Sequence, residues 1–268
     1  MNINYARLAN SKRIVVKVGT STLTYKNGKM NLKRIDRLAM VLCDLANMGK
    51  EVVLVSSGAM GVAVGKLGLT EKPKDIVTKQ AIAAVGQCEL MMLYDRMFGG
   101  YNRTVAQILL TKDDIAIAKR EENTKNTFNR LIEMGIIPIV NENDTVSFDE
   151  IVIGDNDNLS AVVAKLINAD LLILLSDIDG LYDDDPHKNE NAKLLSVVDD
   201  VESVKFMASE SSTKQGTGGM ITKLEAAEIA TESGIDMVIT NGENIDSIYD
   251  ILDGNIKGTL FVAKEVEK

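Results

Sequence analysis

The segment Gln215 to Lys223 (QGTGGMITK) places three glycines and a lysine at the predicted start of a helix. Free N–H groups and the positive end of a helix dipole bind phosphate well, and a lysine adds positive charge. A glycine-rich linker is the alternative interpretation. The chain contains neither GxxxxGK[ST] nor GxGxxG. A phosphate site here is therefore neither a P-loop nor a dinucleotide fingerprint.

Two predicted strands end in similar polar turns. The first ends in Lys17-Val18-Gly19-Thr20-Ser21 and the second in Ser56-Ser57-Gly58-Ala59-Met60-Gly61. Glycine lets the backbone pass close to a ligand, hydroxyls donate hydrogen bonds, and Lys17 supplies a charge for phosphate. Each turn taken alone is also consistent with a tight strand-to-helix connection. Together they favour a binding site.

Carboxamides and carboxylates are dense in Asn141-Glu142-Asn143-Asp144-Thr145 and in Gly154-Asp155-Asn156-Asp157-Asn158. These groups suit a site that binds an ammonium group and several oxygens together. Solvated loops with Asx turns or helix caps are the alternative. The aspartates between Asp177 and Asp185 lack the spacing and final glutamate of an EF-hand, so we interpret them mainly as a solvated loop.

Alternating strands and helices must position these turns, which predicts a parallel sheet. Ligands bind at the carboxyl ends of the strands in such sheets. The predicted strands are Arg13–Val18, Glu51–Ser56, Val105–Leu110, Ile136–Val140, Ile151–Ile153, Leu171–Leu175, Met237–Thr240 and Thr259–Val262. Helices are expected at Leu32–Met48 and at about Arg120–Met134, Leu159–Asn168 and Gly219–Ser233. Further helices are expected between the turn after the second strand and about Phe98, and a short one before the last strand. The unbroken apolar run LLILL predicts that Leu171–Leu175 lies at the centre of the sheet.

Composition excludes several classes of function. The 268 residues carry a net charge of -9 without a Lys/Arg run, which argues against a nucleic-acid partner. No apolar run is long enough for a membrane span or a signal peptide, which predicts a cytoplasmic protein. Cys43 and Cys88 are expected to be buried thiols. The single histidine, His187, lies in a polar stretch, so histidine-based catalysis and Cys/His metal sites are disfavoured.

Six motifs, in order along the whole chain, resemble the glutamate 5-kinases of the amino acid kinase superfamily. They are KVGTSTLT, VSSGAMGVAVG, PIVNENDTV, GDNDNLSA, LLSDIDGLY and GTGGMITK. Other superfamily members commonly carry a double glycine after the first lysine, where this chain has Val18-Gly19. The resemblance implies a three-layer α/β/α sandwich with a mostly parallel eight-stranded sheet. It further implies one domain over residues 1–268, with an amino-acid lobe to about 165 and a nucleotide lobe from about 166.

The resemblance also assigns roles to individual residues. Lys17 and Lys223 would contact the transferring phosphoryl group, and Asp157 would position both lysines. Glutamate would be held by Ser57, Asp144 and Asn156. The remaining set would hold ATP: Lys17, Ser176, Asp177, Thr217, Gly218, Gly219, Met220, Ile221, Thr222 and Lys223.

The implied reaction makes γ-glutamyl phosphate from ATP and L-glutamate with Mg²⁺, the first step of proline biosynthesis. A γ-carboxylate is already ionised at neutral pH, so its attack on phosphorus requires no general base. Proline as a feedback inhibitor, glutamyl phosphate reductase as a partner, and a homo-dimer or tetramer are further family expectations. The C-terminal PUA domain of many bacterial members is not expected here. A kinase for another small acceptor and a non-catalytic nucleotide or amino-acid sensor are the alternative functions.

Overall fold

The computed structural model describes residues 6–25, 29–69, 73–146, 156–184, 186, 188–205 and 219–265. Its strands follow the order β3-β4-β2-β1-β5-β7-β8-β6 in one eight-stranded sheet, which confirms the predicted fold class. Their bounds are β1 (Arg13–Val18), β2 (Glu51–Ser56), β3 (Val105–Leu110), β4 (Ile137–Glu142), β5 (Leu171–Ser176), β6 (Val197–Val198), β7 (Asp236–Asn241) and β8 (Gly258–Phe261).

The chain divides into two compact units. One contains Met1–Lys17 and Asp157–Lys268, and the other contains Val18–Asn156. The division thus falls at Asp157, whereas the sequence analysis expected a change of lobe near residue 165, and the first 17 residues group with the C-terminal part. Each unit is considered separately below.

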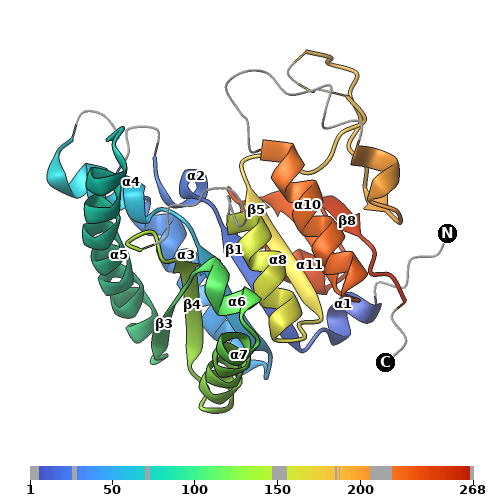
Figure 1. Ribbon diagram of the computed structural model, residues 1–268. Coiled ribbons are helices and arrows are strands. Elements are labelled where there is room, and N and C mark those ends of the chain that lie inside the picture. The colour runs from blue at the N-terminus through green and yellow to red at the C-terminus, as the bar shows by residue number, and fades with distance from the viewer. Residues whose placement is uncertain are drawn as a thin grey trace. The chain divides into compact units, whose positions relative to one another are not determined.

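The unit Val18–Asn156 contains the parallel strands β2, β4 and β3. Its helices are α2 (Thr20–Leu23), α3 (Leu32–Asn47), α4 (Ala59–Leu67), α5 (Ile76–Gly99), α6 (Lys112–Ala116) and α7 (Ala118–Glu133). The chain passes from β2 across β4 to β3 and then returns to β4, so right-handed crossovers place α5 and α7 on opposite faces. In Figure 1, α6 and α7 lie on the near side of these strands and α3 on the far side.

The other unit is built around β5, whose six residues are all buried. Strand β7 pairs with β5 in parallel, β8 pairs with β7 antiparallel, and β6 pairs with β8 in parallel. The helices are α1 (Ala6–Asn10), α8 (Asn156–Leu166), α10 (Gly219–Glu232) and α11 (Ser247–Leu252), with a 3-10 turn at Glu202–Val204. Helices α8 and α10 lie on the near side of β5 in Figure 1. Complete burial of β5 agrees with its predicted place inside the sheet.

Most predicted elements are confirmed to within a few residues. Helix α8 begins at Asn156, three residues before the predicted start, so Asn156, Asp157 and Asn158 of the carboxamide and carboxylate motif lie in its first turn. The two-residue strand β6 was not predicted. The prediction for Cys88 was wrong: its thiol is exposed, whereas Cys43 is buried. The predicted strand Ile151–Ile153 and His187 lie outside the described residues.

Candidate active site

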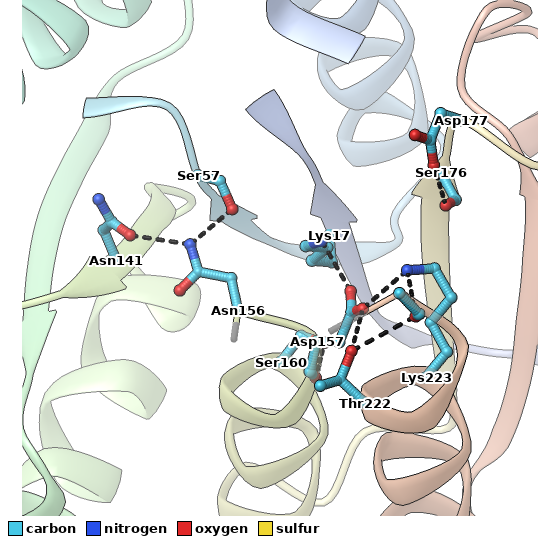
Figure 2. Close-up of polar contacts among 11 residues, drawn as sticks. Lys17, Ser57, Asn141, Asn156, Asp157, Ser160, Ser176, Asp177, Thr222 and Lys223 are labelled. Atoms are coloured by element: carbon cyan, nitrogen blue, oxygen red, sulfur yellow. Dashed lines mark hydrogen bonds and ion pairs between the residues drawn. The ribbon is translucent and has the colours of Figure 1, made fainter. Parts of the chain in front are cut away.

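Three charged side chains meet in the unit that contains β5. Lys17 lies near the carboxyl end of β1, Asp157 lies in the first turn of α8, and Lys223 lies near the start of α10. Lys17 Nζ is 2.7 Å from Asp157 Oδ1, and Lys223 Nζ donates a hydrogen bond of 3.0 Å to Asp157 Oδ2. Figure 2 shows one carboxylate between the two ammonium groups. The structure therefore brings all three predicted catalytic residues together.

This cluster is almost completely buried. The exposed fractions of the Lys17, Lys223 and Asp157 side chains are 8%, 9% and 1%. Burial alone would raise the pKa of Asp157, but attraction to Lys17 and Lys223 outweighs it and holds that pKa below its ordinary value. The ionised trio carries one excess positive charge. A buried site with that charge is suited to an anion such as a phosphoryl group.

Neighbouring groups fix the direction of Lys223. Its Nζ also donates to the Gly219 carbonyl oxygen at 3.0 Å, within the first turn of α10. The Thr222 hydroxyl lies 3.3 Å from Asp157 Oδ2. These contacts hold the ammonium group close to the helix start, where the sequence analysis placed phosphate.

A second group of predicted residues lines a cavity of about 190 Å³ in the unit Val18–Asn156. The wall comes from the start of α2, the turn between β2 and α4, the end of β4 and the start of α8. The lining residues are Thr20, Ser57, Gly58, Ala59, Met60, Gly61, Asn141, Glu142, Asp144 and Asn156. All three residues predicted to hold glutamate are among them. A cavity of this volume suits a small ligand.

Close helix packing forms one wall of this cavity. Gly58 has φ = 106°, a left-handed conformation that glycine adopts without strain, and it directs the chain into α4. A Cβ atom on Gly86 of α5 would lie only 1.8 Å from the Ala59 carbonyl oxygen. The wall formed by α4 therefore depends on glycine at position 86.

Asn156 is held inside this cavity by two hydrogen bonds. Its Nδ2 donates to Ser57 Oγ at 2.8 Å and to Asn141 Oδ1 at 2.9 Å (Figure 2). Asn141 Nδ2 in turn donates to Gln87 Oε1 at 2.9 Å. The sequence analysis placed Asn141 in a polar motif without a role of its own and missed Gln87. The available signal was a glutamine between Ala83 and Leu90 on the apolar face of a helix.

Asp144 lies in the same cavity with its carboxylate partly withdrawn from water. Burial raises its pKa above the ordinary value. The structure shows no ion pair of Asp144 with any residue that it describes. An ammonium group bound there would supply a countercharge for this carboxylate.

Apart from Lys17 on β1, the described residues predicted to hold ATP lie at the carboxyl end of β5 and the start of α10. Ser176 is the buried last residue of β5, and its hydroxyl lies 3.1 Å from Oδ1 of the exposed Asp177. Gly219 is the first residue of α10, and Ile221 in the same turn is 43% exposed. Thr217 and Gly218 lie outside the described residues. The described part of the expected nucleotide site thus consists of a strand end and a helix start in one unit.

Comparison with known proteins places this arrangement in a family. The model of the amino acid kinase family matches residues 12–241. A glutamate 5-kinase of Clostridium perfringens is 57% identical over 97% of this chain and 98% of its own length. The chain belongs to the glutamate 5-kinases of the amino acid kinase family. Another glutamate 5-kinase, from Listeria innocua, is 51% identical over 97% of the chain. A glutamate 5-kinase from Thermoanaerobacter pseudethanolicus is 50% identical over 93% of this chain. The match covers 68% of the length of that relative.

Two solved structures with low sequence identity share the fold. A UMP kinase from Ureaplasma parvum matches with a TM-score of 0.67 at 16% identity, over 94% of this chain and 99% of that one. A carbamate kinase from Giardia lamblia matches with a TM-score of 0.67 at 18% identity, over 96% and 100% of the two chains. These likenesses show that the chain has the same fold as the two kinases.

Within the described ranges, no helix has both the length and the apolarity needed to cross a bilayer. In the same ranges, no group of three or more His, Cys, Asp and Glu side chains could hold a metal ion.

Proposed function

We propose that this chain transfers the γ-phosphoryl group of ATP to the γ-carboxylate of L-glutamate. A carboxylate oxygen attacks the γ-phosphorus, the bond from that phosphorus to the β-bridging oxygen breaks, and ADP and γ-glutamyl phosphate result. The observation that carries this proposal is the buried Lys17–Asp157–Lys223 cluster. Its excess positive charge offsets the repulsion between an anionic acceptor and an anionic donor, and it stabilises the charge on the transferring group.

The cavity around Ser57 supports glutamate as the acceptor. Asp144 has the charge and the burial to bind the substrate ammonium, which a plain dicarboxylate lacks. The Ser57 hydroxyl accepts from Asn156, so its own proton can be donated to a substrate carboxylate. Asn156 and Asp157 are consecutive residues, so their α-carbons are about 3.8 Å apart. One peptide bond therefore joins Asn156, which we assign to glutamate binding, to Asp157, which positions the two lysines.

We assign the nucleotide to the end of β5 and the start of α10. Ser176 and Asp177 follow the buried strand, and Gly219, Met220, Ile221, Thr222 and Lys223 open the helix, with Thr217 and Gly218 preceding it in the sequence. Mg²⁺ usually binds phosphate oxygens and retains several waters. Since the described residues form no metal cluster, we assign Mg²⁺ to the ATP phosphates. Bound there, it would neutralise part of their charge.

The proposal extends to the setting of the reaction. We propose a cytoplasmic enzyme that makes γ-glutamyl phosphate as the first intermediate of proline biosynthesis. Proline as a feedback inhibitor at the glutamate cavity, glutamyl phosphate reductase as the enzyme that consumes the product, and a homo-dimer or tetramer are part of the same proposal. The inhibition constant for proline tests the feedback inhibition, and equilibrium sedimentation tests the oligomeric state.

The test of the reaction is ATP turnover with Mg²⁺ and L-glutamate in the presence of hydroxylamine, which converts an acyl phosphate into a hydroxamate. Aspartate, N-acetylglutamate and no acceptor are the controls. A glutamate-dependent hydroxamate is expected. Hydroxamate formation only with another acceptor would replace glutamate as the substrate, and binding of ATP without turnover would favour a sensor.

A further inference from the structure

Gln87 is a buried polar residue outside the set that lines the cavity. It lies on α5 with only 8% of its surface exposed, among buried neighbours such as Ala83 and Leu90. Its Oε1 accepts a hydrogen bond of 2.9 Å from Asn141 Nδ2. This hydrogen bond connects α5 to the end of β4. Gln87 therefore contacts Asn141, which lines the cavity, but does not line the cavity itself.

The hydrogen bonds that end at Gln87 all run in one direction: Asn156 donates to Asn141, and Asn141 donates to Gln87. Because Asn141 uses its NH₂ group on Gln87, it presents Oδ1 to Asn156. Asn156 then uses its NH₂ group on Asn141 and on Ser57, at 2.9 and 2.8 Å. Both protons of the Asn156 amide are engaged, which leaves its Oδ1 as the atom available to a ligand.

The direction of this chain of amides determines the polarity of the cavity. The oxygen and nitrogen of a side-chain amide have nearly the same size, so packing alone does not choose between its two orientations. In the observed orientation, the cavity offers the Asn156 oxygen and the Asp144 carboxylate, and both attract an ammonium group. The reversed orientation would present an NH₂ group, which repels that cation.

We propose that Gln87 is a positioning residue that orients Asn141 and, through it, Asn156, so that the cavity binds the ammonium group of an amino-acid substrate. This inference rests on the proposed phosphorylation of glutamate. It adds acceptor recognition by a residue that does not contact the substrate.

The test compares three variants on one helix. Gln87→Met keeps the length of the side chain but removes the acceptor, and Gln87→Glu keeps an acceptor for the Asn141 amide. Gln80→Met makes the same change two turns earlier on α5, where the side chain is half-buried and outside the amide chain. We expect Gln87→Met to raise KM for glutamate roughly tenfold, with kcat and KM for ATP within about twofold of wild type. Gln80→Met should leave all three constants within about twofold.

A double-mutant cycle distinguishes positioning from general damage. In an Asn156→Ala background, Gln87→Met should change kcat/KM for glutamate by less than about twofold, because the residue through which it acts is gone. A full tenfold effect in that background would overturn the proposal. So would equal effects of Gln87→Met on KM for glutamate and for ATP.

Gln87→Glu provides a test that holds even if Gln87→Met does not fold. Its KM for glutamate should stay within about threefold of wild type, and a rise of tenfold would overturn the role of position 87 as an acceptor. Wild-type protein without glutamate-dependent turnover would instead contradict the proposed function. The two failures are therefore distinguishable.

Discussion

Replacing Asp157 with asparagine preserves the size of the side chain but removes the negative charge between two buried ammonium groups. The contacts of 2.7 and 3.0 Å correspond to Coulomb attractions of about 6 kcal/mol each at an effective dielectric constant of about 20. Much of this attraction is already offset by the cost of removing the three charges from water. Removing one member of a buried ion pair nevertheless costs about 3–5 kcal/mol, because the remaining charges stay buried without compensation. We expect Asp157→Asn to lower the free energy of unfolding by that amount.

The same change should also reduce turnover. Repulsion between Lys17 and Lys223 displaces both from the phosphoryl group, and the loss of one well-placed charged group typically lowers kcat by about 10²–10³-fold. Urea unfolding and the hydroxamate assay measure the two effects. Asp236→Asn is the matched control, since Asp236 is also buried but pairs with the half-exposed Arg7 at 3.3 Å. The control should keep its kcat, and wild-type values of stability and kcat in Asp157→Asn would refute the reasoning.

Acidification tests the same carboxylate. Because the folded-state pKa of Asp157 is lowered, its ion pairs stabilise the protein above the unfolded-state pKa, and this contribution is lost as pH falls through the folded-state pKa. Acid unfolding should therefore be less steep in Asp157→Asn than in the wild type, when the two are compared by circular dichroism. Equal pH dependence in both proteins would contradict the assignment.

Three further variants test separate parts of the site. Lys223→Met should lower kcat by at least about 10²-fold while KM for ATP changes less, and an unchanged kcat would remove Lys223 from the transition state. Asp144→Asn should raise KM for glutamate. Because burial raises the pKa of Asp144, wild-type kcat/KM for glutamate should fall on the acid side of the pH profile as this carboxylate is protonated, and the variant should lose that component. Gly86→Ala should destabilise the protein by about 2 kcal/mol or more in urea unfolding, since its Cβ would overlap the Ala59 carbonyl; unchanged stability would mean that α4 and α5 can separate at little cost.

The fold was largely predictable because local patterns agreed with one another. Apolar runs such as Leu171–Leu175 and helical spacing such as that of Ile35, Leu38 and Leu42 indicate both the element and its buried side. Strand β6 was missed because two residues carry no periodic pattern. Cys88 was misjudged because α5 is apolar over much of its surface, so position alone does not identify its exposed side.

The candidate site was predictable where a residue type signals its own chemistry. Lysines beside glycine-rich turns pointed to Lys17 and Lys223, whereas the role of Asp157 came from the resemblance to the glutamate 5-kinases. Their meeting on one carboxylate depends on contacts between residues 140 and 66 positions apart, which no local pattern encodes. Gln87 was missed for the same reason: its role depends on Asn141, which lies 54 positions away.

The most direct test of phosphoryl transfer to a carboxylate is to follow the oxygen atoms of glutamate. Glutamate with ¹⁸O in both γ-carboxylate oxygens is incubated with ATP, Mg²⁺, hydroxylamine and the wild-type protein, and the released phosphate is analysed by mass spectrometry. Attack by the carboxylate on phosphorus leaves one labelled oxygen in the P–O–C bridge, and attack by hydroxylamine on the acyl carbon then releases it with the phosphate. The account predicts one ¹⁸O atom in each phosphate formed with the hydroxamate. Unlabelled phosphate would contradict it.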